Sequence, residues 1–183
     1  MTPADSTAVA VERRRGDDSG ATMSKASFVA MVAGAVIVLD QLTKWYVRQT
    51  IPVYETIPVI NGFFSIIHAR NPGGAFSLFA GANHGIRMPF FFLASATAIV
   101  VLFYYLRQIP SDQRWLLFAV AAVLGGAVGN LIDRVLFGEV TDFLLVYWHQ
   151  YQWPAFNVAD SFISIGVTIL VGHSLFVRDT PGA

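Results

Sequence analysis

The sequence predicts a mainly α-helical membrane protein, in which a bundle of four transmembrane helices carries a small extracytoplasmic β-sheet. Composition is the first observation behind this class. Of the 183 residues, 55% are hydrophobic and only 13% are charged, with a mean hydropathy of +0.55, whereas a soluble domain carries about 25% charged residues. The second observation is four apolar stretches, each long enough to cross a bilayer, which takes roughly 20 residues. A chain of this length fits a single domain.

The four stretches are flanked by aromatic residues of the kind found at membrane interfaces. We expect transmembrane spans at about residues 27–47, 88–106, 115–136 and 158–177. The first stretch could instead be a cleaved signal peptide. It is longer than the apolar region of such a peptide, and no small-x-small cleavage site follows it. We therefore interpret it as a permanent span.

The ends of the chain are polar and charged. We expect residues 1–24 to form a disordered tail, residues 25–178 the single four-span domain, and residues 179–183 a second short tail. Basic residues mark the inner side of a membrane protein. They gather near the N-terminus and around the second connection, at Arg13, Arg14, Arg15, Lys25, Arg107 and Arg114. The long first connection holds Arg48, Arg70 and Arg87, and the last connection has no Lys or Arg. Both termini are therefore predicted to be cytoplasmic.

The first outer connection contains two short β-prone runs, residues 57–60 and 63–67, around Asn61-Gly62. This dipeptide favours a two-residue hairpin turn. A third run, residues 143–148, lies in the other outer connection. These runs predict a small sheet at the outer face, and the alternative is a pair of irregular loops.

Polar side chains gather at the outer ends of the predicted spans. They are Asp40, Thr43 and Lys44 in the first span, Asn130, Asp133 and Arg134 in the third, Asp142 just after it, and Asn157, Asp160 and Ser161 at the start of the fourth. A charged group near the centre of a membrane helix costs about 2.5–3.5 kcal/mol. We therefore expect these groups to face the bundle interior. Gly125 and Gly129 form a small-xxx-small pattern that favours close packing of the third span on a neighbour.

Several of these side chains have a structural explanation. Asp40 and Lys44 stand four residues apart on one helix face, where they can form an ion pair. We favour that pairing over a chemical role. Asn130 and Arg134 share a face in the same way, and Asp133 adjoins it.

Asp142 and Asp160 differ, because the segment between them contains no Lys or Arg. Two carboxyl groups brought together without a cation cannot both ionise cheaply, so one keeps its proton. A pair in that state can hydrolyse a peptide bond, because one carboxylate activates water and the other carboxyl polarises the carbonyl group. The alternative is that Asp160 only caps the fourth helix and Asp142 lies in solvent. Spacing alone does not decide between the two.

Other chemistries have less support. The chain has no cysteine, no HExxH motif and four scattered histidines, so we expect no metal and no cofactor. Its zero formal net charge gives no indication of nucleic-acid binding. A Ser161–Lys44 dyad is disfavoured because Asp40 would keep Lys44 charged. A proton- or ion-coupled transporter would commonly have internal repeats and midplane charges, which we do not find. A structural membrane subunit would not need uncompensated aspartates.

Five segments together resemble lipoprotein signal peptidase, also called signal peptidase II. They are Asp40-Gln41-Leu42-Thr43-Lys44, Asn71-Pro72-Gly73-Gly74-Ala75-Phe76-Ser77, the stretch from Gly125 to Arg134, Val140-Thr141-Asp142-Phe143, and Phe156-Asn157-Val158-Ala159-Asp160-Ser161. The resemblance covers about residues 27–177. The loop departs from it at Pro72 and Gly74, where Thr and Ala are common in the family.

The resemblance implies an aspartic endopeptidase of the bacterial plasma membrane that cuts diacylglyceryl-modified prolipoproteins just before the lipidated cysteine. It implies Asp142 and Asp160 as the catalytic pair, with the active site at the extracytoplasmic face and the outer sheet forming a β-cradle. The residues it implies for substrate binding are Asn71, Asn130, Arg134 and Asn157. Lipid-modified prolipoprotein and membrane lipid are the expected partners, the protein is expected to act as a monomer, and globomycin is expected to inhibit it. Asp40, Lys44 and Asp133 keep the structural role given above.

Overall fold

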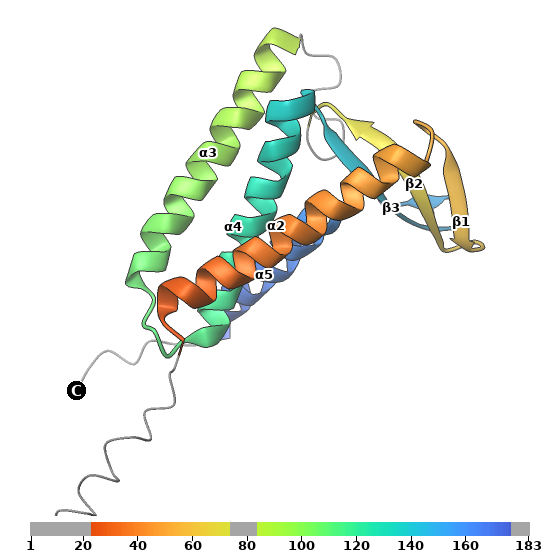
Figure 1. The fold of residues 1–183 in the computed structure, drawn as a ribbon. Helices are drawn as coiled ribbons and strands as arrows, with labels where there is room; N and C mark the ends of the chain where they lie inside the picture. The colour runs from red at the N-terminus through yellow and green to blue at the C-terminus, as the bar shows by residue number, and fades with distance from the viewer. Residues whose placement is uncertain (1–22, 74–83, 177–183) are drawn as a thin grey trace, which may run out of the picture.

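The computed structural model describes residues 23–73 and 84–176, and it contains four long helices and a small sheet (Figure 1). The helices are α2 (Lys25–Thr50), α3 (His84–Gln108), α4 (Arg114–Phe137) and α5 (Val158–Phe176). All four are long and apolar enough to cross a membrane. The predicted spans are therefore confirmed as helices. Most of the two predicted tails, and residues 74–77 of the loop motif, lie outside the described residues.

Helix boundaries follow local chemistry. The side chain of Ser24 accepts a hydrogen bond from the backbone N of Ser27 and so caps the start of α2. The helix continues to Thr50, past the predicted end at residue 47, and Ile51 is extended. The residue before a proline is disfavoured in the helical conformation, and Pro52 follows Ile51. Arg48, counted above with the loop residues, thus belongs to the helix.

Helix α4 occupies the centre of the bundle, where it packs against α2, α3 and α5. Leu117, Val120 and Ala121 form part of its fully buried surface. A Cβ atom on Gly125 would lie 2.8 Å from the carbonyl oxygen of Ala33 in α2. The predicted close packing of these glycines is therefore confirmed, because only a residue without a side chain allows this approach.

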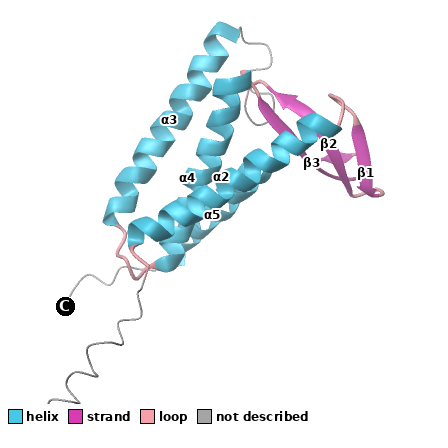
Figure 2. Cartoon of the chain, in the orientation of Figure 1, coloured by secondary structure: helices cyan, strands magenta, loops and turns pink. Residues whose placement is uncertain are grey.

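The sheet contains four antiparallel strands in the order β1-β2-β3-β4, and Figure 2 shows it at one end of the bundle. The strands are β1 (Thr56–Ile60), β2 (Phe64–Asn71), β3 (Val140–Trp148) and β4 (Tyr151–Gln152). The predicted hairpin and sheet are confirmed, and the irregular-loop alternative is wrong for these segments. The turn has three residues rather than two, because the strands are shifted by a bulge between Pro58 and Ile60. Gly62 takes the left-handed conformation there, with φ of 78°.

Strand β3 joins the helices to the sheet. It starts at Val140, earlier than predicted, and Asp142 therefore belongs to the strand, opposite Ala69 of β2. Gly138, with φ of 77°, ends α4 in the left-handed conformation typical of a helix C-terminus. This turn brings the start of β3 beside the end of α4.

Candidate active site

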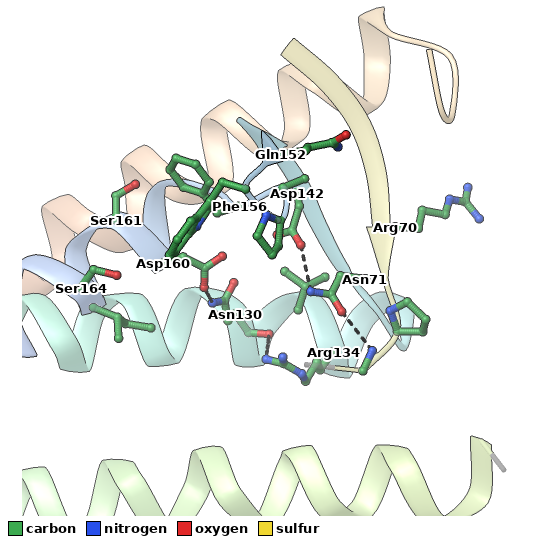
Figure 3. A pocket seen from close by; sticks show the side chains of 17 residues that line it. Arg70, Asn71, Asn130, Arg134, Asp142, Gln152, Phe156, Asp160, Ser161 and Ser164 are labelled. Carbon is green, nitrogen blue, oxygen red and sulfur yellow. Dashed lines mark hydrogen bonds between the residues drawn. The ribbon is translucent and has the colours of Figure 1, made fainter. Parts of the chain in front are cut away.

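Several polar residues singled out in the sequence meet where the sheet joins the bundle, among them Asn130, Arg134, Asp142, Asp160 and Ser161 (Figure 3). The end of α4, the start of α5 and the adjoining parts of β2 and β3 enclose a cavity of about 950 Å³. Its polar lining includes Arg70, Asn71, Asn130, Arg134, Asp142, Gln152, Asp160, Ser161 and Ser164. Apolar side chains, among them Phe156 and Ile163, form part of the wall. The predicted convergence of polar groups at one end of the bundle is confirmed.

Asp142 points into this cavity from β3, although it is only 2% exposed. Two asparagine side chains hold its carboxyl group. The Nδ2 of Asn71 donates to Oδ2 at 2.9 Å, and the Nδ2 of Asn157 donates to Oδ1 at 2.7 Å. The alternative that Asp142 lies in solvent is therefore wrong, because strand β3 carries it inward.

Asp160 points into the same cavity from the first turn of α5 (Figure 3). Its Oδ1 accepts a hydrogen bond from the Nδ2 of Asn130 at 2.8 Å. Its Oδ2 accepts from the backbone N of Asn157 at 3.3 Å, while Oδ1 of Asn157 accepts from the backbone N of Asp160 at 3.0 Å. This reciprocal arrangement is a capping box. Asp160 thus caps the helix, as the alternative held, and also presents its carboxyl group to the cavity.

Two amide side chains connect the two carboxyl groups. The Nδ2 of Asn157 donates to the Oδ1 of Asn130 at 3.1 Å, in addition to its bond to Asp142. Asn157 is fully buried and does not line the cavity. Its bonds therefore favour a role in positioning Asp142 and Asp160, which we call the carboxyl pair.

Among the residues that the structure describes, the carboxyl pair has no directly bonded cation. Within the described residues, neither Asp142 nor Asp160 forms a salt bridge. Burial, followed by the negative charge of Asp160, raises the pKa of Asp142 from 3.8 to about 7. A buried carboxyl next to another carboxyl keeps its proton to a higher pH, and this is the state expected from the sequence.

Two further aspartates, Asp40 and Asp133, are fully buried, and basic side chains balance their charges. The Nζ of Lys44 lies 2.8 Å from the Oδ2 of Asp40 and 3.4 Å from the Oδ2 of Asp133, and all three side chains are fully buried. Arg48 approaches the Oδ1 of Asp133 at 3.5 Å. We call these four residues the ion cluster. The predicted pairing of Asp40 with Lys44 is confirmed.

The ion cluster contacts the backbone beside each member of the carboxyl pair. The Oδ1 of Asp40 accepts from the backbone N of Ala159 at 2.9 Å, and the Oδ2 of Asp133 accepts from the backbone N of Thr141 at 3.0 Å. Each bonded residue immediately precedes one of the two aspartates in the sequence. The ion cluster thus fixes the two segments from which the carboxyl groups project.

Sequence reasoning missed two residues of this network. Arg48 donates to the hydroxyl of Thr141 at 3.1 Å, and Gln41 donates to the carbonyl oxygen of Gly129 at 3.0 Å. Arg48 was detectable, since it follows Lys44 by one helical turn on the same face. It was overlooked because it lies beyond the apolar stretch. Gln41 carried no comparable signal.

The remaining predicted residues have distinct surroundings. Arg134 lines the cavity, donates to the backbone oxygen of Asn130 at 3.2 Å and lies over the ring of Phe91. Ser161 donates to the carbonyl oxygen of Asn157 at 2.9 Å. Lys44 instead contacts Asp40, Asp133 and Asn130. The Ser161–Lys44 dyad is therefore not formed. In the described part of the chain, no three His, Asp or Glu side chains are grouped to hold a metal ion.

Comparison with known proteins gives consistent matches. The family model described as signal peptidase (SPase) II matches residues 32–176. The lipoprotein signal peptidase of Desulforapulum autotrophicum is 50% identical over 149 residues, which are 81% of this chain and 91% of that protein. The lipoprotein signal peptidase of Geobacter sulfurreducens is 50% identical over 143 residues, covering 78% and 88%. A solved bacterial membrane enzyme is 30% identical with a TM-score of 0.71, covering 85% of this chain and 94% of that one.

Proposed function

This chain belongs to the signal peptidase II family, and we propose that it is an aspartic endopeptidase that cuts the signal peptide from diacylglyceryl-modified prolipoproteins just before the lipidated cysteine. The family makes the chain a peptidase, and its four apolar helices and its likeness to bacterial membrane enzymes make it a multi-pass bacterial membrane protein. The observation that carries the proposed catalytic type is the carboxyl pair, which lines one cavity and forms no salt bridge within the described part of the chain.

The chemistry follows from the shared proton of the carboxyl pair. With its pKa raised to about 7, Asp142 is mostly protonated below neutral pH and half protonated near pH 7. The ionised carboxylate takes a proton from a water molecule, whose oxygen attacks the carbonyl carbon of the scissile peptide. The protonated carboxyl donates a hydrogen bond to the carbonyl oxygen. The proton taken from water then passes to the leaving amine as the C–N bond breaks.

Neighbouring side chains support this assignment. Asn71 and Asn157 each donate to Asp142, and Asn130 donates to Asp160, so both carboxyl groups are held in fixed orientations. Held groups contribute to catalysis because the reacting atoms need no reorganisation. We assign Asn71 and Arg134, which line the cavity, to substrate binding as well. Asn130 serves both roles, and Asn157 positions the pair.

We further propose that the cavity faces the extracytoplasmic side and that both termini are cytoplasmic. The start of α2, the end of α3 and the start of α4 bear Lys25, Arg107 and Arg114 at the end of the bundle opposite the sheet (Figure 1). The chain has no native cysteine, so single cysteines report topology cleanly. A membrane-impermeant maleimide should label Asn61→Cys in intact spheroplasts and Ser111→Cys only after permeabilisation. The reverse pattern contradicts the orientation.

The central test is cleavage of a lipidated precursor by purified protein, read on a gel. We expect cleavage by the wild type, and inhibition by globomycin. Asp142→Asn and Asp160→Asn should each lower the rate by roughly 10²–10⁴-fold, the range lost with a general acid or base. Asp112→Asn, which changes an exposed aspartate in the turn between α3 and α4, is the matched control.

Three results would contradict the proposed activity or its assignment to Asp142 and Asp160. Wild-type rates in either carboxyl-pair variant would remove that residue from the chemistry. Equal losses in Asp112→Asn would show a general effect of charge removal. Cleavage of the precursor without its diacylglyceryl group at the same rate would contradict the proposed substrate.

A further inference from the structure

An apolar groove lies at the end of the bundle away from the carboxyl pair. It has a volume of about 650 Å³ and runs between α2, α3 and α4. Its walls include Val29, Ala33 and Ile37 of α2, Phe103 and Leu106 of α3, and Leu124 of α4. The groove is separate from the cavity of the carboxyl pair, and no residue lines both.

The groove exists because α2 and α3 are held apart. Helix α3 packs mainly on α4, and the small side chains of Ala26, Ala30 and Ala33 face the space on the α2 side. Ala30 is exposed although it lies within a span. In a bilayer, an apolar depression of this kind on the outside of the bundle is accessible to acyl chains.

Cations gather at the mouth of the groove. Lys25 and Arg107 line it, and Arg114 lies nearby, where it donates to the carbonyl oxygen of Met23. Among residues 23–73 and 84–176, none of these three forms a salt bridge. The Nη1 of Arg114 is buried and has no hydrogen-bond partner in that part of the chain. Asp112, the acidic residue of the adjoining turn, is exposed.

We propose that this groove binds an anionic phospholipid, with an acyl chain along the apolar wall and the headgroup phosphate at Lys25 and Arg107. Both halves of the site match that ligand: apolar side chains for the hydrocarbon and basic side chains for the phosphate. A signal peptide fits less well. Its basic N-terminal region would lie against the cations of the groove. The inference does not depend on the catalytic assignment of Asp142 and Asp160.

The test uses the full-length protein in nanodiscs that contain equal amounts of phosphatidylglycerol and phosphatidylcholine. Native mass spectrometry then measures which lipid the protein retains after release from the disc. We expect the wild type to retain phosphatidylglycerol preferentially. Arg107→Gln should lower the preference roughly fivefold, and Lys25→Gln/Arg107→Gln should lower it further by a similar factor. Because Arg107 is exposed, its single substitution tests the proposal even if the double variant folds poorly.

Two matched controls separate the groove from general effects. Arg13→Gln/Arg14→Gln removes two charges from the N-terminal segment and should leave the preference unchanged. Ala30→Leu should reduce the phosphatidylglycerol retained by narrowing the groove, whereas Ala98→Leu, on an exposed part of α3 outside the groove lining, should not. An unchanged preference in both Gln variants overturns the proposal, as does an equal loss in the Arg13→Gln/Arg14→Gln control. A lipid-free dimer would instead assign the groove to a second copy of the chain.

Discussion

The ion cluster and the carboxyl pair each contain two aspartates, but they differ in charge balance. The ion cluster sets Lys44 and Arg48 against Asp40 and Asp133, so its formal charges cancel. The carboxyl pair is held by asparagine amides and faces a cavity. A buried ion pair with matched charges is a structural element, whereas an unmatched carboxyl holds a proton that it can exchange. The partners of a buried aspartate, more than its depth, therefore determine whether it has a structural or a chemical role.

Removing the charge of Lys44 from the ion cluster should produce the largest loss of stability. Among the described residues, Lys44→Met leaves Asp40 buried without a basic partner and Asp133 with Arg48 alone as one, and breaking a buried pair costs about 3–5 kcal/mol. The free energy of unfolding, from titration of the purified protein with SDS, measures this loss. Asp40→Asn/Lys44→Met removes one charge of each sign and should recover part of the stability. A double variant less stable than Lys44→Met would contradict the assigned pairing.

Removing a charge from the carboxyl pair should have the opposite effect. The folded pKa of Asp142, about 7, exceeds its ordinary value of 3.8, so between these pH values the folded protein holds a proton that the unfolded chain has lost. This contribution to wild-type stability is complete below pH ~4 and falls by up to ~1.4 kcal/mol per pH unit until pH ~7. Asp142→Asn cannot ionise. The difference between its Tm and that of the wild type should therefore increase from pH ~4 to pH ~7. A difference that stays the same at every pH would contradict the raised pKa of Asp142.

Crowding the ion cluster should have a smaller effect. A Cβ atom on Gly129 would lie 2.6 Å from the Oδ2 of Asp40. Gly129→Ala should therefore displace that carboxylate from Lys44, at a cost of about 1–3 kcal/mol for overpacking. Gly34→Ala in α2 is the matched control, because its added Cβ would meet no described neighbour within 4 Å beyond the adjoining residues and backbone of its own helix. If Gly129→Ala and Gly34→Ala were equally stable, α4 and α2 would be able to move apart without cost, which contradicts the predicted overpacking.

The pH dependence of cleavage tests the carboxyl pair without any substitution in it. If catalysis needs one proton on the carboxyl pair, kcat/KM should decline above pH ~7, where Asp142 ionises, approaching tenfold for each pH unit. Rates across pH 5–9, with protein integrity checked at each value, measure this. Gly34→Ala should keep the wild-type profile. A rate that stays constant up to pH 9 would show that cleavage does not require a protonated Asp142.

Much of the site was predictable because membrane topology is strongly constrained. Four apolar stretches and the alternation of helix direction place the ends of the first and third spans beside the starts of the second and fourth. Asp40, Asn130 and Asp160 could therefore be assigned to one end of the bundle before any contact was known. The i, i+4 spacing of Asp40 and Lys44 also identified a local ion pair, because both partners lie on one helix.

Membrane topology and residue spacing do not predict the contacts between helices and strands. Asp142 was placed near the site by sequence, but its burial depends on the pairing of β3 with β2, which a run of β-prone residues does not specify. The bonds from Asp40 to Ala159 and from Asp133 to Thr141 each join separate segments of the chain. The geometry of these bonds depends on how α2, α4 and α5 pack, and residue spacing along the chain does not predict that packing.

Four apolar helices, a polar end of the bundle and two aspartates without a basic neighbour could be predicted from the chain, because these properties depend on composition and residue order. Two features depend on the folded arrangement. Asn157 links Asp142 to Asn130, and through Asn130 to Asp160. The ion cluster holds the backbone beside both members of the carboxyl pair. The physical reason is the short range of hydrogen bonds, whose strength falls steeply with distance and angle. Which groups come within that range is decided when helices and strands pack together.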